Sequence, residues 1–111
     1  MSQVLSSINN LNHFSNQNSN KLILIKFTAD WCRPCTLIKP FIKEKLEKYT
    51  DTLYLEVSVD DDENAEIVEH FSVKAMPTFV FLENAKVLKT IVGSATNDLD
   101  AFFAEYYKED A

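Results

Sequence analysis

The stretch Trp31-Cys32-Arg33-Pro34-Cys35 holds both cysteines of the 111-residue chain, and the elements expected on either side of it decide the fold. An apolar run at residues 22–27 precedes it, and apolar residues at helical spacing follow it, namely Leu37, Ile38, Phe41, Ile42 and Leu46. The two thiols are therefore expected where a strand turns into a helix. The first turn of a helix has unpaired N–H groups and the positive end of the helix dipole, both of which favour thiolate over thiol. The sequence thus predicts that Cys32 is an exposed, activated nucleophile.

The spacing of the cysteines indicates dithiol–disulfide exchange. Both sulfur atoms can lie on one helical turn, so Cys35 can attack a mixed disulfide formed at Cys32 and close an intramolecular bridge. A zinc site would need two more ligands, and His13 and His70 are too far apart for a His-x3–5-His pattern, so no metal is expected. A permanent structural disulfide is disfavoured because a bridge across two residues closes almost no loop.

Length and charge narrow the range of functions. The chain is long enough for one domain, residues 1–111, and too short for two. Its net charge is −6, so it has no basic surface for nucleic acid. No apolar run reaches membrane-spanning length, and the first residues do not resemble a secretion signal. We therefore expect a cytoplasmic protein that binds neither nucleic acid nor membrane, in a reducing compartment where the two cysteines can cycle.

Hydrophobic periodicity and turn residues predict the other elements. Helices are expected at residues 8–16, 34–49, 63–71 and from Asn97, and strands at 22–27, 52–59, 78–82 and 86–92. Pro40 should bend the long helix, because an interior proline removes one backbone hydrogen bond. The aspartates at 60–62 should cap the third helix and Asn97 the last one. Gly93, the only glycine, marks the one position expected to need a positive φ, and Asn84 should be left-handed in a hairpin turn.

Several motifs together resemble the thioredoxin family. They are Phe27-Thr28-Ala29-Asp30-Trp31-Cys32-x-Pro34-Cys35, Lys39-Pro40, Val59-Asp60, Met76-Pro77-Thr78 and Val92-Gly93, in that order and at that family's spacings. The resemblance covers Val4 to Tyr107. It implies an α/β protein with the thioredoxin fold, in which a mixed central sheet of four to five strands is flanked on both faces by about four helices. The implied order is β-α-β-α-β-α-β-β-α, with a short edge strand at residues 3–6.

The resemblance also implies the activity and the partners. The chain would be a protein-disulfide reductase in which Cys32 and Cys35 cycle, with no bound cofactor. A thioredoxin reductase would supply electrons from NADPH, and proteins that contain disulfides would be the substrates of an expected monomer. Pro77 would be cis and lie against the cysteines, where the Met76 backbone can hydrogen-bond an extended substrate. Trp31 and the backbone of Gly93 would complete this substrate-binding surface.

Two positions depart from the family pattern and are expected to tune the redox chemistry. Arg33 stands beside Pro34 where thioredoxins generally carry Gly, and Lys26 stands where most carry a buried Asp. An ammonium on a strand buried on both faces must pair or lose its proton, and Glu56 on the neighbouring strand is the expected partner. The alternative is that Lys26 extends its amine to water beside Asp30.

Two other functions stay open at this point. An oxidase or isomerase of disulfides is favoured by the cationic Arg33 and disfavoured by the missing secretion signal. A binding module that keeps the fold without turnover is disfavoured by the presence of both cysteines and Pro77.

Overall fold

The computed structural model describes residues 3–4 and 7–108 of the chain. Its elements are β1 (Gln3–Val4), α1 (Ile8–Gln17), β2 (Ile23–Thr28), α2 (Arg33–Leu37), α3 (Lys39–Lys48), β3 (Leu53–Ser58), the 3-10 turn η1 (Asp62–Asn64), α4 (Ala65–His70), β4 (Thr78–Glu83), β5 (Lys86–Val92) and α5 (Thr96–Tyr106). The predicted order of strands and helices is confirmed. Residues 5–6 of the expected edge strand lie outside the described residues.

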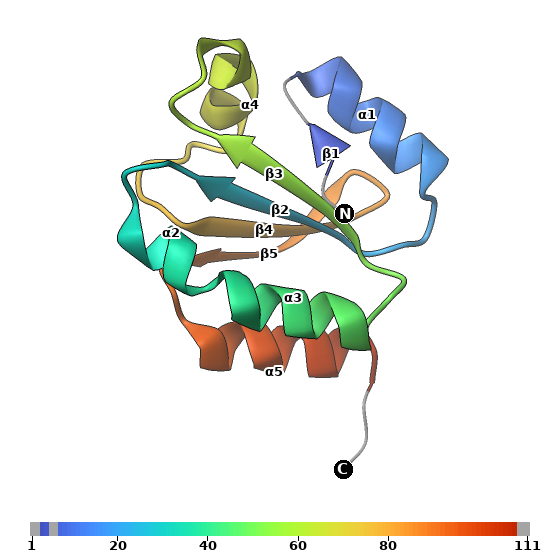
Figure 1. The fold of residues 1–111 in the computed structure, drawn as a ribbon. Coiled ribbons are helices and arrows are strands. Elements are labelled where there is room, and N and C mark those ends of the chain that lie inside the picture. Colours follow the sequence, from blue (N-terminus) through green and yellow to red (C-terminus); the bar gives the residue numbers. More distant parts are fainter. Residues whose placement is uncertain (1–2, 5–6, 109–111) are drawn as a thin grey trace.

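The strands form one mixed sheet in the order β1-β3-β2-β4-β5. Strands β1, β3 and β2 pair in parallel, whereas β4 and β5 are antiparallel to their neighbours. In Figure 1, α3 and α5 lie along one face of the sheet, and α1 and α4 lie beyond the other. The α/β architecture with helices on both faces, expected from the thioredoxin resemblance, is therefore confirmed.

Strand β2 is central and is buried on both faces, as predicted. Ile23, Ile25 and Phe27 belong to the apolar cluster that contains α1 and α4 residues, while Leu22 and Leu24 belong to the cluster under α3 and α5. This alternation follows from the two-residue period of a strand. It places residue 26 on the face covered by α2 and α3, with Glu56 as its direct partner on β3.

The helix after the cysteines is broken rather than bent. The predicted helix at 34–49 divides at Ile38 into α2 and α3, so the break comes two residues before Pro40. Pro40 lies in the first turn of α3, where a missing N–H leaves no backbone hydrogen bond unmade. The expected separation of a short redox helix from a longer packing helix is confirmed, with the position of the break corrected.

Of the two helix-cap predictions, one is confirmed and the other is wrong. The Asp61 side chain accepts a hydrogen bond from the Glu63 backbone N–H at 3.0 Å, so an aspartate does cap the η1 turn that leads into α4. The prediction that Asn97 caps the last helix is wrong. Helix α5 begins one residue earlier, at Thr96, and its N-cap residue Ala95 has no side chain that can accept a hydrogen bond.

Positive φ angles are more widespread than expected. Asn84 has a φ of 53° and Gly93 one of 92°, as predicted. Gly93 is nevertheless not the one such position, because Asn20, Ser72, Ala85 and Lys108 also have positive φ. A chain with one glycine builds these turns from residues that adopt the left-handed conformation at some steric cost.

Candidate active site

Cys32 and Cys35 lie at the turn from β2 into α2, as predicted. Cys32 is the N-cap residue of α2, and its Sγ accepts a hydrogen bond from the Cys35 backbone N–H at 3.2 Å. The two cysteines form a disulfide, with 5.3 Å between their Cα atoms. An N–H aimed at Sγ from the first turn of a helix stabilises negative charge on that sulfur. The local geometry thus favours Cys32 as the thiolate when the bridge is open.

The disulfide is more enclosed than the sequence suggested. Cys32 is 4% exposed and Cys35 is 1% exposed, so the expectation of an exposed Cys32 is wrong for this oxidised state. Both pack with Ala29, and Val59 and Met76 cover them from other segments of the chain. A substrate therefore meets a small sulfur surface set among apolar side chains.

Trp31 stands beside this surface and is 68% exposed, which is unusual for so large an apolar side chain. Its indole N–H donates a hydrogen bond to Asp60 Oδ1 at 3.0 Å, and Asp60 follows β3. The ring is thus held from a neighbouring strand end while its face remains open to solvent. An open, oriented aromatic ring is suited to contact with a partner protein.

The segment from Met76 to Thr78 reaches the cysteines through the Met76 side chain. The Met76–Pro77 peptide bond is cis, and Met76 packs against the cysteine cluster. The Gly93 N–H donates to the Pro77 carbonyl oxygen at 2.8 Å, which joins the loop after β5 to this segment. A Cβ atom at Gly93 would meet nothing within 4 Å, so glycine is required here by the positive φ and not by close packing.

Arg33 and Pro34 form the exposed part of the redox motif. Pro34 lies in the first turn of α2, where proline is well tolerated. Arg33 is exposed and follows Cys32 directly.

Lys26 is fully buried and approaches the backbone of Cys35. Its Nζ donates a hydrogen bond to the Cys35 carbonyl oxygen at 2.8 Å, and Glu56 Oε2 lies 3.8 Å from the same Nζ. The predicted pairing with Glu56 is confirmed, and the alternative of an amine in water beside Asp30 is wrong. Burial lowers the pKa of Lys26 below its ordinary value, Glu56 partly offsets this by raising it, and Lys39 lowers it further.

Comparison with known proteins decides the family. The family model described as Thioredoxin matches residues 4–105, which is most of the chain. The chain belongs to the thioredoxin family. A Brassica oleracea protein named Thioredoxin H-type is 43% identical over 83 residues, covering 75% of this chain and 66% of that relative. A thioredoxin from Ophiophagus hannah is 36% identical over 102 residues, covering 89% of this chain and 95% of that relative.

Solved thioredoxin structures agree with this assignment. The X-ray structure of Fasciola hepatica thioredoxin is 31% identical, covers 95% of this chain and 98% of that chain, and superposes with a TM-score of 0.85. Members of the thioredoxin family are thiol–disulfide oxidoreductases that act on protein disulfides through a redox-active disulfide and without a bound cofactor. The Cys32–Cys35 bridge is the group in this chain that fits that chemistry.

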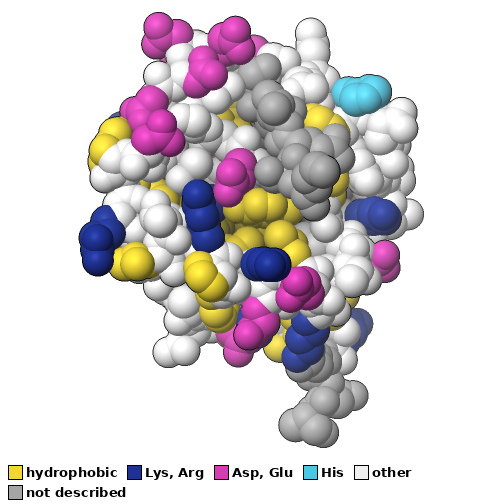
Figure 2. Space-filling view, in the orientation of Figure 1, with side chains coloured by type: hydrophobic (Ala, Val, Ile, Leu, Met, Phe, Trp, Pro, Cys, Tyr) yellow, Lys and Arg dark blue, Asp and Glu magenta, His cyan; other side chains and the backbone are white. Residues whose placement is uncertain are grey.

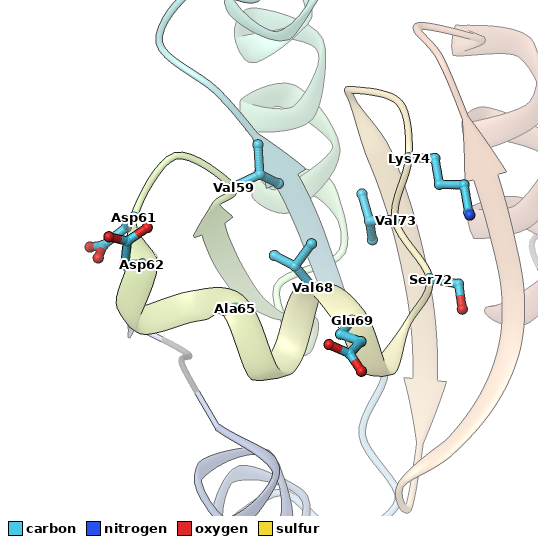
Figure 3. Close-up of a pocket in the computed structure, with 9 residues that line it drawn as sticks. All are labelled: Val59, Asp61, Asp62, Ala65, Val68, Glu69, Ser72, Val73 and Lys74. Atoms are coloured by element: carbon cyan, nitrogen blue, oxygen red, sulfur yellow. The ribbon is translucent and has the colours of Figure 1, made fainter.

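A pocket of about 450 Å³ lies beside this thioredoxin site, between the η1–α4 segment and residues 72–74. Figure 3 shows Val59, Val68 and Val73 converging on it, with Asp61 and Asp62 set to one side. Val59 also contacts the cysteine cluster, so the pocket adjoins the site without holding a redox group. Acidic side chains gather at the same end of the molecule, above η1 and α4 (Figure 2).

Within residues 3–4 and 7–108, no three His, Cys, Asp or Glu side chains are grouped as metal ligands would be.

Sequence reasoning missed the contacts made by Asp60 and Tyr54. The pattern at residues 60–62 predicts that Asp60 helps to cap a helix, whereas its Oδ1 accepts the indole N–H of Trp31. The Tyr54 hydroxyl donates to Glu56 Oε2 at 2.8 Å. Since residues two apart on a strand share a face, the spacing of Tyr54 and Glu56 indicates that their side chains can meet.

None of the helices among the described residues is long and apolar enough to cross a membrane.

Proposed function

We propose that this chain is a protein-disulfide reductase of the thioredoxin family, formed by residues 1–111 as one domain. The observation that carries the proposal is the Cys32–Cys35 disulfide at the start of α2, against which Met76 packs just before the cis bond to Pro77. The Cys32 thiolate attacks one sulfur of a substrate disulfide, and the other substrate sulfur leaves as a thiolate. The Cys35 thiolate then attacks Cys32 Sγ, and the first substrate sulfur leaves with its electron pair. The substrate gains two electrons, and this chain is left as the disulfide.

The substrate-binding surface proposed here consists of Trp31, Met76, Pro77 and Gly93. The exposed Trp31 ring provides a flat apolar contact, and Met76 packs against the two cysteines. The hydrogen bond between Gly93 and Pro77 keeps the two backbone segments together. An extended substrate segment can hydrogen-bond to backbone of this kind while its disulfide reaches Cys32.

Regeneration of the dithiol requires an electron donor, and we propose a thioredoxin reductase that uses NADPH. We also propose that the protein is a cytoplasmic monomer. The chemistry supports the compartment, since a dithiol that must be reduced in each cycle works where thiols are kept reduced.

Reduction of insulin tests the proposed activity. The wild-type chain, supplied with a dithiol reductant, should accelerate insulin precipitation over the reductant alone. A chain that folds and titrates normally but gives no acceleration would instead act as a binding module.

The residue after Cys32 supports one further candidate, an oxidase or isomerase of disulfides. A guanidinium next to the sulfur stabilises the thiolate and hence the reduced form, which raises the reduction potential. The potential therefore separates the two functions: a value in the range of reductases supports the first proposal, and a strongly oxidising value supports the second.

Replacing Arg33 by glycine is expected to raise the pKa of Cys32 by about half a unit and to lower the reduction potential. The effect is small because Arg33 is exposed and water screens its charge. Thiolate absorbance followed across pH measures the Cys32 pKa, and Arg33→Lys, which keeps the charge, is the matched control. An Arg33→Gly protein with an unchanged or lower Cys32 pKa would refute this role.

A further inference from the structure

A buried lysine lies under the redox helix, and the carboxylate that pairs with it reaches the surface. The Lys26 side chain is 0% exposed, whereas the Glu56 side chain is 34% exposed. Lys26 Nζ contacts both the Cys35 carbonyl oxygen, at 2.8 Å, and Glu56 Oε2, at 3.8 Å. Glu56 therefore stands between the ammonium and solvent, and Lys26 stands between Glu56 and Cys35.

The solvent side of Glu56 is a groove of about 770 Å³ between α3 and β3. Tyr54 and Glu56 line it from β3, and Lys39, Pro40, Ile42, Lys43, Leu46 and Glu47 line it from α3 and its start. Figure 2 shows hydrophobic surface in this strip, with lysine and acidic side chains at its margins. The carboxylate thus keeps contact with water, which lowers the cost of leaving it ionised beside a buried cation.

Tyr54 holds this carboxylate in place. Its hydroxyl donates to Glu56 Oε2 at 2.8 Å, and Oε2 is also the oxygen nearest to Lys26 Nζ. Burial and the adjacent Glu56 raise the pKa of Tyr54, so its hydroxyl stays a donor throughout the neutral range. One carboxylate oxygen therefore faces the tyrosine and the lysine together.

We propose that Glu56, held by the Tyr54 hydroxyl, is a positioning residue that keeps the Lys26 side chain charged and directed at the backbone of Cys35. The role rests on the proposed reductase function, because the charge acts on the Cys35 thiolate during the second step. Among the described residues, the titratable groups around Lys26 are Glu56 on β3, Lys39 on α3 and Cys35 on α2. Its neighbour on β4, Phe79, is apolar.

The charge state of Lys26 has a defined effect on the resolving step. A charged Lys26 stabilises the Cys35 thiolate, which forms the new bond to Cys32 Sγ while the substrate sulfur leaves with its electron pair. Glu56 is the group that offsets the desolvation of the ammonium. Without Glu56, Lys26 loses its proton at lower pH, and above that pH Cys35 has no cation beside it.

Titration of Lys26 tests the proposal directly. In the oxidised protein, the NMR shift of the Lys26 Cε atom, followed across pH, should show that Glu56→Gln lowers the Lys26 pKa by about one unit or more. Glu56→Asp, which keeps the charge, should recover part of the shift, and Tyr54→Phe should give a smaller decrease. These variants keep the test informative if one of them folds poorly.

The reduction potential, measured across pH, tests the effect of Glu56 on the redox pair. Below the new Lys26 pKa, Glu56→Gln leaves an unopposed cation that stabilises the Cys35 thiolate more than in wild type. Above that pKa the amine is neutral and stabilises the thiolate less. The difference in potential between Glu56→Gln and wild type should therefore change sign as pH rises, which loss of structure alone would not produce.

The chain offers a matched control. The Tyr106 hydroxyl donates to Glu83 Oε1 at 2.9 Å, and Glu83 ends β4 at the opposite end from Pro77. Glu83→Gln and Tyr106→Phe should leave the Lys26 titration unchanged. An unaltered Lys26 pKa in Glu56→Gln, or an equal shift in Glu83→Gln, would overturn the proposal. The titration needs no substrate, so failure to reduce insulin with the Lys26 shift intact rejects only the reductase function.

Discussion

Replacing Cys32 by serine is expected to reduce insulin reduction to the background rate, whereas Cys35→Ser should still attack disulfides and accumulate a covalent mixed disulfide. Cys32 is the N-cap of α2 and receives the Cys35 N–H, so it is the sulfur that local structure activates. Cys35 is more deeply buried, and its sulfur is needed only to close the bridge. Without the Cys35 sulfur, the mixed disulfide at Cys32 cannot be resolved within the molecule.

Trapping measures this division of labour. Each variant is incubated with a protein disulfide, and the adducts are separated without reductant and identified by mass. Adducts should form with Cys35→Ser and disappear on reduction. Equal recovery of adducts from the Cys32→Ser protein would show that the two roles are assigned the wrong way round.

Replacing Lys26 by aspartate is expected to destabilise the fold and to raise the apparent pKa of Cys35. Residue 26 is the direct partner of Glu56 across β2 and β3, so in the variant two carboxylates lie next to each other. Loss of a buried pairing partner costs about 3 kcal/mol of stability. The two carboxyl groups would also share a proton, with an apparent pKa well above the usual range for a carboxyl group. A carboxylate near Cys35 opposes its thiolate, so the Cys35 pKa should rise by about one unit and the reduction potential should become more negative.

Cys35 titration and stopped-flow rates of mixed-disulfide resolution, compared across pH with wild type, measure this effect. The apparent pKa values belong to the coupled group of both thiols and residue 26. Resolution in Lys26→Asp should depend on titration of the new carboxylate. Superimposable curves for the two proteins would mean that residue 26 takes no part in proton handling.

The exchanged double variant Lys26→Asp/Glu56→Lys is the control for charge placement. It restores opposite charges across the same strand pair while placing the carboxylate nearer to Cys35. Its free energy of unfolding should recover part of the loss seen in Lys26→Asp, as a double-mutant cycle would show. The raised Cys35 pKa should remain, because it depends on the charge at residue 26 and not on stability.

Local signals explain why the sequence predicted so much of the redox turn. A continuous apolar run, a Trp-flanked pair of cysteines and apolar residues at helical spacing lie within one short segment, and strand and helix formation depend on such neighbours. The same run predicts that residue 26 lies on a strand covered on both faces, although it does not settle whether the long side chain reaches water. Glu56 could be named as its partner because the adjacent strand was recognised from its own pattern.

Features that depend on several segments were decided by the tertiary structure. Cys32 is enclosed because Val59 and Met76, distant in sequence, pack over the cysteines. Asn97 does not cap α5 because the helix has already begun at Thr96, with Ala95 as its N-cap residue. A capping residue acts only where the backbone enters the helix, and local composition does not determine that point.

The environment of Lys26 shows most clearly which features follow from local sequence and which follow from the packing of distant segments. The apolar run indicates a lysine on a strand covered on both faces, and it leaves two places for the amine: beside Glu56, or in water beside Asp30. The packing of β3 and α2 selects the first, because the amine contacts the Cys35 carbonyl oxygen and Glu56, with Tyr54 on the far side of the carboxylate. This follows because the β2–β3 register sets which side chains meet, and α2 brings the Cys35 carbonyl oxygen within hydrogen-bond distance of Lys26.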